Sequence, residues 1–213
     1  MGELKVLGRT TSSNVMKVLW TAAELDLPFV REDVGGPYGG VDTPAYRALN
    51  PNGLVPTLLD GGVDGGVAIW ESNTICRYLC NKAGETALYP AAPAARGLCE
   101  RWMDWQLSTL APHAGIFWIM NVRTPEAQRD PAVLAAKRED MAKALRIVEA
   151  ALGTQPFLGG ARMTLADVAL GPWGHRWFAL GADQGQFPNM AAWYARLQTR
   201  PGYQTHVVKV PLS

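Results

Sequence analysis

The sequence predicts an α/β unit of about 80 residues followed by a larger all-helical unit. In the first unit, strand patterns alternate with helical ones. After a connector rich in Pro and Ala at residues 85–93, only helical patterns follow. We therefore expect one domain at residues 1–84, a linker at 85–93 and an all-helical domain at 94–213.

Short extended runs predict four strands in the first domain, at residues 3–8, 29–33, 55–59 and 67–70. Apolar residues at helical spacing predict helices from Val15 to Leu25 and from Ser72 to Ala83, and Asp42-Thr43-Pro44 begins a short one. The glycine-rich run at residues 60–66 lacks the spacing of a phosphate loop and precedes an extended run rather than a helix. It therefore predicts a hairpin turn.

The second domain shows two amphipathic stripes, one at residues 98–105 and one at 134–152. Thr164 and Asp167 have the spacing of a capping box and predict the start of a further helix. The apolar pattern of that helix continues to Leu180, and Pro172 and Gly174 are expected to interrupt it. A last short helix is expected at residues 189–198.

The composition excludes several classes of function. The chain has 213 residues, 20 Lys and Arg against 19 Asp and Glu, and a net charge of +1, which argues against a nucleic-acid partner. No apolar run is long enough for a membrane span, and the first residues lack the pattern of a secretory signal, so we expect a cytoplasmic protein. Its three cysteines do not have metal-ligand spacing, and no metal is expected.

Three local features could hold a small polar ligand. The polar run Thr10 to Asn14 follows the first strand and opens the first helix, and Glu71-Ser72-Asn73 opens a later helix. Helix N-termini present unpaired N–H groups to an anion, although ordinary capping explains such residues equally well. The third feature is Val55-Pro56, whose backbone would be exposed if the bond were cis.

The order and separation of these features resemble the glutathione S-transferase family. The resemblance rests on residues 8–18 (GRTTSSNVMKV), on 50–56 (NPNGLVP), on Glu71-Ser72 with the helix that follows, and on the capping box at 164–167. It spans essentially the whole chain. It implies a thioredoxin-like glutathione-binding domain followed by an all-helical domain, and it is nearest to bacterial serine-type transferases with a theta- or phi-like motif.

The resemblance also implies roles for individual residues. Ser12, six residues before Val18, would donate a hydrogen bond to the glutathione sulfur and stabilise its thiolate, with Ser13 and Asn14 as alternatives. The Val55 backbone would pair with the cysteinyl unit, with Pro56 cis. Glu71 and Ser72 would hold the ammonium and carboxylate of the γ-glutamyl unit.

Departures from the family pattern narrow the expected reaction. Position 12 is neither Tyr nor Cys, which disfavours tyrosine-type activation and a cysteine-based deglutathionylation or disulfide reaction. Asn14 replaces a Cys of the isomerase class. Leu54 stands where several classes place a Gln that touches glutathione, and no residue is identified for the glycyl carboxylate.

The resemblance implies a glutathione transferase that conjugates or dehalogenates small electrophiles in detoxification, as a homodimer. Trp118 and Arg123 are the candidates for the electrophile pocket, because the segment around Trp118 is apolar all round. Core packing for Trp118 and a solvated surface for Arg123 are the alternatives. The alternative function is a non-catalytic stress or interaction protein with the same fold.

Overall fold

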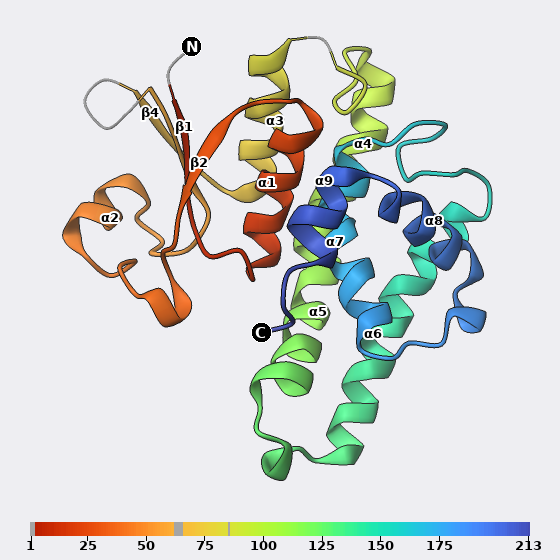
Figure 1. Ribbon diagram of the computed structural model, residues 1–213. Helices are drawn as coiled ribbons and strands as arrows, with labels where there is room; N and C mark the ends of the chain where they lie inside the picture. Colours follow the sequence, from red (N-terminus) through yellow and green to blue (C-terminus); the bar gives the residue numbers. More distant parts are fainter. Residues whose placement is uncertain (1–2, 62–65, 85) are drawn as a thin grey trace. The chain divides into compact units, whose positions relative to one another are not determined.

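The computed structural model describes residues 3–61, 66–84 and 86–213 (Figure 1). The chain divides into two compact units, Met1–Thr86 with Pro201–Val210, and Ala87–Arg200 with Pro211–Ser213. The first contains a sheet and helices and the second only helices, which confirms the predicted fold class. Residues 201–210, a segment that the sequence pattern placed in the helical domain, belong instead to the first unit by their contacts.

The first unit is built on a four-stranded mixed sheet. Its strands lie in the order β2-β1-β3-β4, and β1 pairs parallel with β2 and antiparallel with β3. The strands are β1 (Leu4–Leu7), β2 (Phe29–Glu32), β3 (Thr57–Asp60) and β4 (Val67–Trp70). β3 and β4 pair antiparallel, as a hairpin requires, but residues 62–65 of the predicted turn lie outside the described residues.

Helices α1 (Ser13–Glu24) and α3 (Ser72–Ala83) lie side by side on one face of the sheet, and the short α2 (Pro44–Leu49) lies on the other (Figure 1). The apolar stripe predicted for α1 is its buried face. The short helix α9 (Pro201–Tyr203) and the π-helical η6 (Gln204–Val208) also pack against α1, where the rings of Trp20 and Tyr203 lie 4.6 Å apart. This aromatic contact explains why the segment at 201–210 joins the first unit.

The second unit surrounds a buried helix. Its helices are α4 (Pro93–Trp105), α5 (Ala111–Trp118), α6 (Pro131–Leu152), α7 (Leu165–Ala179) and α8 (Pro188–Gln198), with π-helical turns η2 (Gln106–Leu110) and η3 (Ile119–Arg123) before and after α5. All residues of α7 from Leu165 to Phe178 are buried. None of the described helices is both long and apolar enough to cross a membrane.

Helix α7 begins with the predicted capping box, but it is not interrupted where the sequence suggested. The Asp167 carboxylate accepts the Thr164 backbone N–H at 2.9 Å. The expected interruption at Pro172 and Gly174 is wrong, because the helix runs through both residues. A Cβ on Gly174 would lie 2.6 Å from the Trp193 ring, so this glycine allows α8 to pack closely against α7.

Candidate functional site

The turn between β1 and α1 carries the first group of candidate residues. Ser12 occupies the N-cap position of α1 with an extended backbone, and its side chain makes no capping hydrogen bond. Ser13 is buried, and Asn14 is half-buried. The Ser12 hydroxyl is half-buried at the positive end of a 12-residue helix and is not used by that helix. It can therefore serve an external acceptor, above all an anionic one.

Close packing at Gly8 brings the Val55 segment to this turn. A Cβ on Gly8 would lie 2.5 Å from Val15 Cγ2 and 3.2 Å from Val55 Cβ. Only glycine therefore allows the end of β1, the start of α1 and Val55 to meet.

The Val55-Pro56 peptide bond is cis, as the resemblance implied. Val55 is half-buried, and no hydrogen bond joins its backbone N–H or C=O to another group within the described ranges. An extended segment with free backbone groups can pair with the backbone of a bound peptide, in the manner of a strand added to a sheet edge.

A buried polar network, which the sequence analysis missed, holds the segment before Val55. Asn50 is 2% exposed, and its side-chain amide donates to the Leu54 carbonyl at 2.8 Å and to the Thr57 hydroxyl at 3.1 Å. The Tyr46 hydroxyl donates to the same carbonyl at 2.6 Å. These bonds fix the chain on both sides of Val55. The sequence offered only the Asn-Pro turn signal, which does not show that the amide is buried.

We expect Asn50→Ala to weaken glutathione binding severalfold and to lower the free energy of unfolding by about 1–3 kcal/mol, because the buried Thr57 hydroxyl and the partly buried Leu54 carbonyl each lose a donor. Titration calorimetry and chemical denaturation measure the two effects. Gln128→Ala, which removes an amide side chain at an exposed position of the helical unit, is the control. Equal glutathione affinity in both variants would show that the network does not shape the Val55 segment.

The start of α3 provides the remaining candidates in the first unit. Glu71 is exposed and adopts φ 70° and ψ 109°, a conformation that residues other than glycine rarely adopt. Ser72 is 3% exposed, and its hydroxyl donates to Asn14 Oδ1 at 3.3 Å. The first turn of α3 thus lies against the first turn of α1. A carboxylate, a hydroxyl and helix N–H groups meet here, a set that suits an amino acid's ammonium and carboxylate.

The two candidates for the electrophile pocket belong to the second unit. Trp118 is 4% exposed at the end of α5, and the Arg176 guanidinium lies 3.8 Å from its ring centre. This cation–π contact inside the helical unit is typical of a packed core residue. Arg123 ends η3 and is exposed.

The cysteines are removed from the solvent. Cys76, Cys80 and Cys99 are buried, and none of the three forms a disulfide. Burial raises the pKa of the Cys76 and Cys99 thiols, which makes them poor nucleophiles. In the described part of the chain, no group of three or more His, Cys, Asp or Glu side chains could hold a metal ion.

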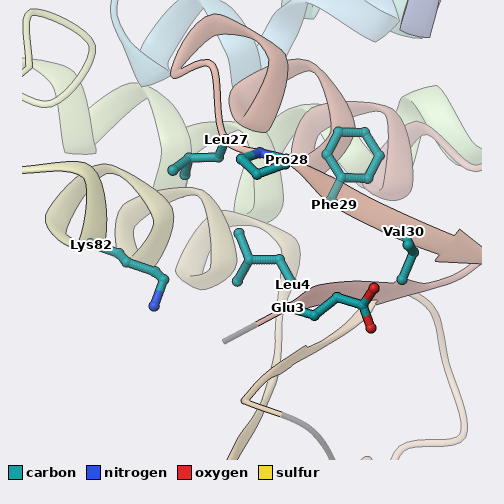
Figure 2. Close-up of a pocket in the computed structure, with 7 residues that line it drawn as sticks. All are labelled: Glu3, Leu4, Leu27, Pro28, Phe29, Val30 and Lys82. Carbon is teal, nitrogen blue, oxygen red and sulfur yellow. The ribbon is translucent and has the colours of Figure 1, made fainter. Parts of the chain in front are cut away.

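A separate cavity of about 230 Å³ lies beside the start of β1, whereas Ser12 follows the end of that strand (Figure 2). Its walls are mostly apolar, with Glu3 and Lys82 as the charged groups, and the Lys82 ammonium is paired with Asp60 at 2.7 Å. None of the candidate residues lines this cavity. It is therefore distinct from the candidate site.

Comparison with known proteins gives consistent matches over both units. The family model "Glutathione S-transferase, N-terminal domain" matches residues 11–82, and "Glutathione S-transferase, C-terminal domain" matches residues 131–196. The Escherichia coli K12 protein "Glutathione S-transferase GstB" is 37% identical over 207 residues, which cover 97% of this chain and 98% of that protein.

Two further relatives bear on the chemistry. The structure of a theta class glutathione S-transferase from Xanthomonas axonopodis pv. citri with glutathione bound has a TM-score of 0.92 and 46% identity, with both chains covered completely. The E. coli K12 protein "Disulfide-bond oxidoreductase YfcG" is 27% identical over 96% of this chain and 94% of that protein.

Proposed function

We propose that this chain, which belongs to the glutathione S-transferase family, binds glutathione in its first unit and transfers the glutathionyl group, through its sulfur, to small electrophiles. The observation that carries the proposal is the grouping of the unused Ser12 hydroxyl, the unpaired Val55 backbone and the Glu71-Ser72 turn around the start of α1. Glutathione bound to the Xanthomonas structure supports the same ligand here.

In this proposal the chain acts on glutathione through three contacts. The Val55 backbone pairs with the cysteinyl unit, beside the cis Pro56. Glu71 holds the γ-glutamyl ammonium, while Ser72 and the N-terminus of α3 hold its carboxylate. The Ser12 hydroxyl donates to the sulfur and favours the thiolate, and the thiol proton passes to the solvent. The Ser12 hydroxyl does not itself remove the thiol proton, because it is too weakly acidic to ionise to an alkoxide base.

The thiolate then attacks an electrophilic carbon. In a dehalogenation, the new S–C bond forms as the carbon–halogen bond breaks, and the halide leaves with the bonding electron pair. Arg123, which is exposed, remains our candidate for contact with the electrophile, since a cation suits a small molecule that bears a halide or a carboxylate, whereas the buried Trp118 packs in the core. We extend the proposal to a cytoplasmic homodimer that detoxifies such compounds.

One observation favours a second candidate, a glutathione-dependent reduction of disulfides: the similarity to YfcG. A protein thiol would not carry this reaction, because all three cysteines are buried. Assays of one preparation with glutathione plus either 1-chloro-2,4-dinitrobenzene or hydroxyethyl disulfide distinguish the candidates. Faster turnover of the disulfide would favour the second.

We expect glutathione to bind with a dissociation constant that rises at least about tenfold in Glu71→Ala, because a charge-assisted hydrogen bond to the ammonium is lost. Titration calorimetry measures this change. Glu126→Gln, at an exposed position of the helical unit, is the control and should bind as the wild type does. If the wild-type protein takes up no glutathione at millimolar concentration, the non-catalytic alternative is favoured instead.

A further inference from the structure

A buried lysine lies between the two helices that carry the candidate site. Lys17, on α1, is 1% exposed. Burial lowers its pKa from 10.5 to about 8, while Cys76 and Glu71 act in the opposite direction. At neutral pH the side chain is therefore still mostly an ammonium ion. Burying an ammonium is costly, and such groups are retained with partners that hold them.

The partners of Lys17 lie in the first turn of α3. The Lys17 ammonium donates to Asn73 Oδ1 at 3.0 Å, and Asn73 is itself 2% exposed. The Glu71 carboxylate is near enough to favour the charged lysine. The ammonium thus acts on both neighbours of Ser72.

A second bridge joins the same faces of the two helices. Asn14, which lies three residues before Lys17 and hence on the same side of α1, accepts the Ser72 hydroxyl. Together the two bridges hold residues 71–73 against α1. Glu71 needs such support, because its backbone has a positive φ. A residue keeps such an unfavourable conformation only where the surrounding structure enforces it.

We propose that Lys17 is a positioning residue: through Asn73 it fixes the first turn of α3 in the orientation that receives the γ-glutamyl end of glutathione. This inference rests on the proposed function. Lys17 itself does not touch the ligand. Its removal therefore affects the part of the affinity that the γ-glutamyl group supplies, and leaves the part supplied by the cysteinyl and glycyl units.

The test compares two ligands in the full-length protein, S-methylglutathione and S-methylcysteinylglycine, which lacks the γ-glutamyl group. The dissociation constant of S-methylcysteinylglycine divided by that of S-methylglutathione reports how much the γ-glutamyl group contributes to the affinity. We expect Lys17→Met to reduce the ratio about tenfold, the effect of one charge-assisted hydrogen bond. Thr21→Val is the matched control. It removes a hydroxyl that bonds Cys76 at 3.2 Å across the same helix pair, and it should leave the ratio unchanged.

Two variants of the acceptor make the test independent of how well Lys17→Met folds. Asn73→Asp keeps an oxygen for the ammonium and should preserve the ratio, whereas Asn73→Leu removes the acceptor and should reduce it. Circular dichroism confirms that each variant is folded. Unchanged ratios in Lys17→Met and Asn73→Leu, or an equal weakening of both ligands, would overturn the inference. A wild-type protein that binds neither ligand would instead overturn the proposed function.

Discussion

Replacement of Ser12 by Ala is expected to lower the rate of glutathione transfer at pH 7 by about 10- to 100-fold. A hydrogen bond to a charged acceptor contributes about 1.5–3 kcal/mol, which corresponds to about one to two pH units in the pKa of the bound thiol. Without this donor, the pKa of the bound glutathione thiol should return toward its ordinary value of about 8.5, and less thiolate should be present at neutral pH.

Two measurements check this result. The ultraviolet absorbance of the thiolate in the binary complex, recorded against pH, gives the pKa of the bound thiol directly. The rate with 1-chloro-2,4-dinitrobenzene as the electrophile should recover in Ser12→Ala at high pH, because there the thiol ionises without help. A loss of rate that persists at high pH would show that Ser12 does something other than stabilise the thiolate.

The neighbouring residues provide the controls. Ser13→Ala should have a small effect, because Ser13 is buried in the first turn of α1. Asn14→Ala should weaken glutathione binding more than it changes the pKa of the thiol, since Asn14 contacts Ser72. If Ser13→Ala or Asn14→Ala raises the thiol pKa and Ser12→Ala does not, the sulfur contact belongs to the neighbour.

The strands, α1 and α3 could be predicted from the sequence because their signals are local. An apolar stripe ends at Pro28, the Asn-Pro-x-Gly turn precedes an extended run, and Glu71-Ser72 opens a helix. The candidate site residues Ser12, Val55 and Ser72, which lie after β1, before β3 and at the start of α3, were chosen by residue type and by order along the chain. The structure adds that the Ser12 hydroxyl does not cap α1 and that no hydrogen bond within the described part of the chain uses the Val55 backbone.

Neither Lys17 nor Asn50 could be singled out from the sequence, because the role proposed for each depends on its burial. In the sequence, Lys17 is a charged residue within an amphipathic helix, and such a residue usually faces the solvent. Only the packing of α3 against α1 encloses it. Likewise, the expected break at Pro172 and Gly174 followed from local propensity, which close packing against Trp193 overrides.

Asp167→Ala should give the largest loss of stability, about 3–5 kcal/mol in the free energy of unfolding. The buried carboxylate accepts three donors: the backbone N–H groups of Thr164 and Leu158, and the Trp193 indole N–H, at 2.8–2.9 Å. Removing it leaves these buried donors unpaired and takes away the Asp167 half of the capping box of α7. Chemical denaturation and calorimetry measure the change, with Asp140→Ala, which removes a half-buried carboxylate paired with Lys137 on α6, as the control.

Asp167→Asn replaces the carboxyl group with an amide of nearly equal size that does not titrate. The pH dependence of the difference in stability between the wild type and this variant therefore isolates the effect of the charge. Burial raises the pKa of Asp167 from 3.8 to about 6, because the cost of desolvation exceeds the effect of its hydrogen bonds. A pKa that is higher in the folded than in the unfolded state means that the folded protein takes up the proton more readily. The stability contributed by this group is therefore complete below about pH 3.8 and is lost as the pH rises through about 6.

The wild type should consequently gain stability relative to Asp167→Asn as the pH falls from 7 to 5, by about 1 kcal/mol. Surface carboxylates have the opposite effect on the pH dependence of stability; the pKa of Asp140, for example, is lowered by its hydrogen bond to Lys137. Comparing the two proteins at each pH cancels the titration of these carboxylates, because both proteins contain them. A difference that stays constant over this range would mean that the three donors keep the Asp167 carboxylate ionised despite its burial.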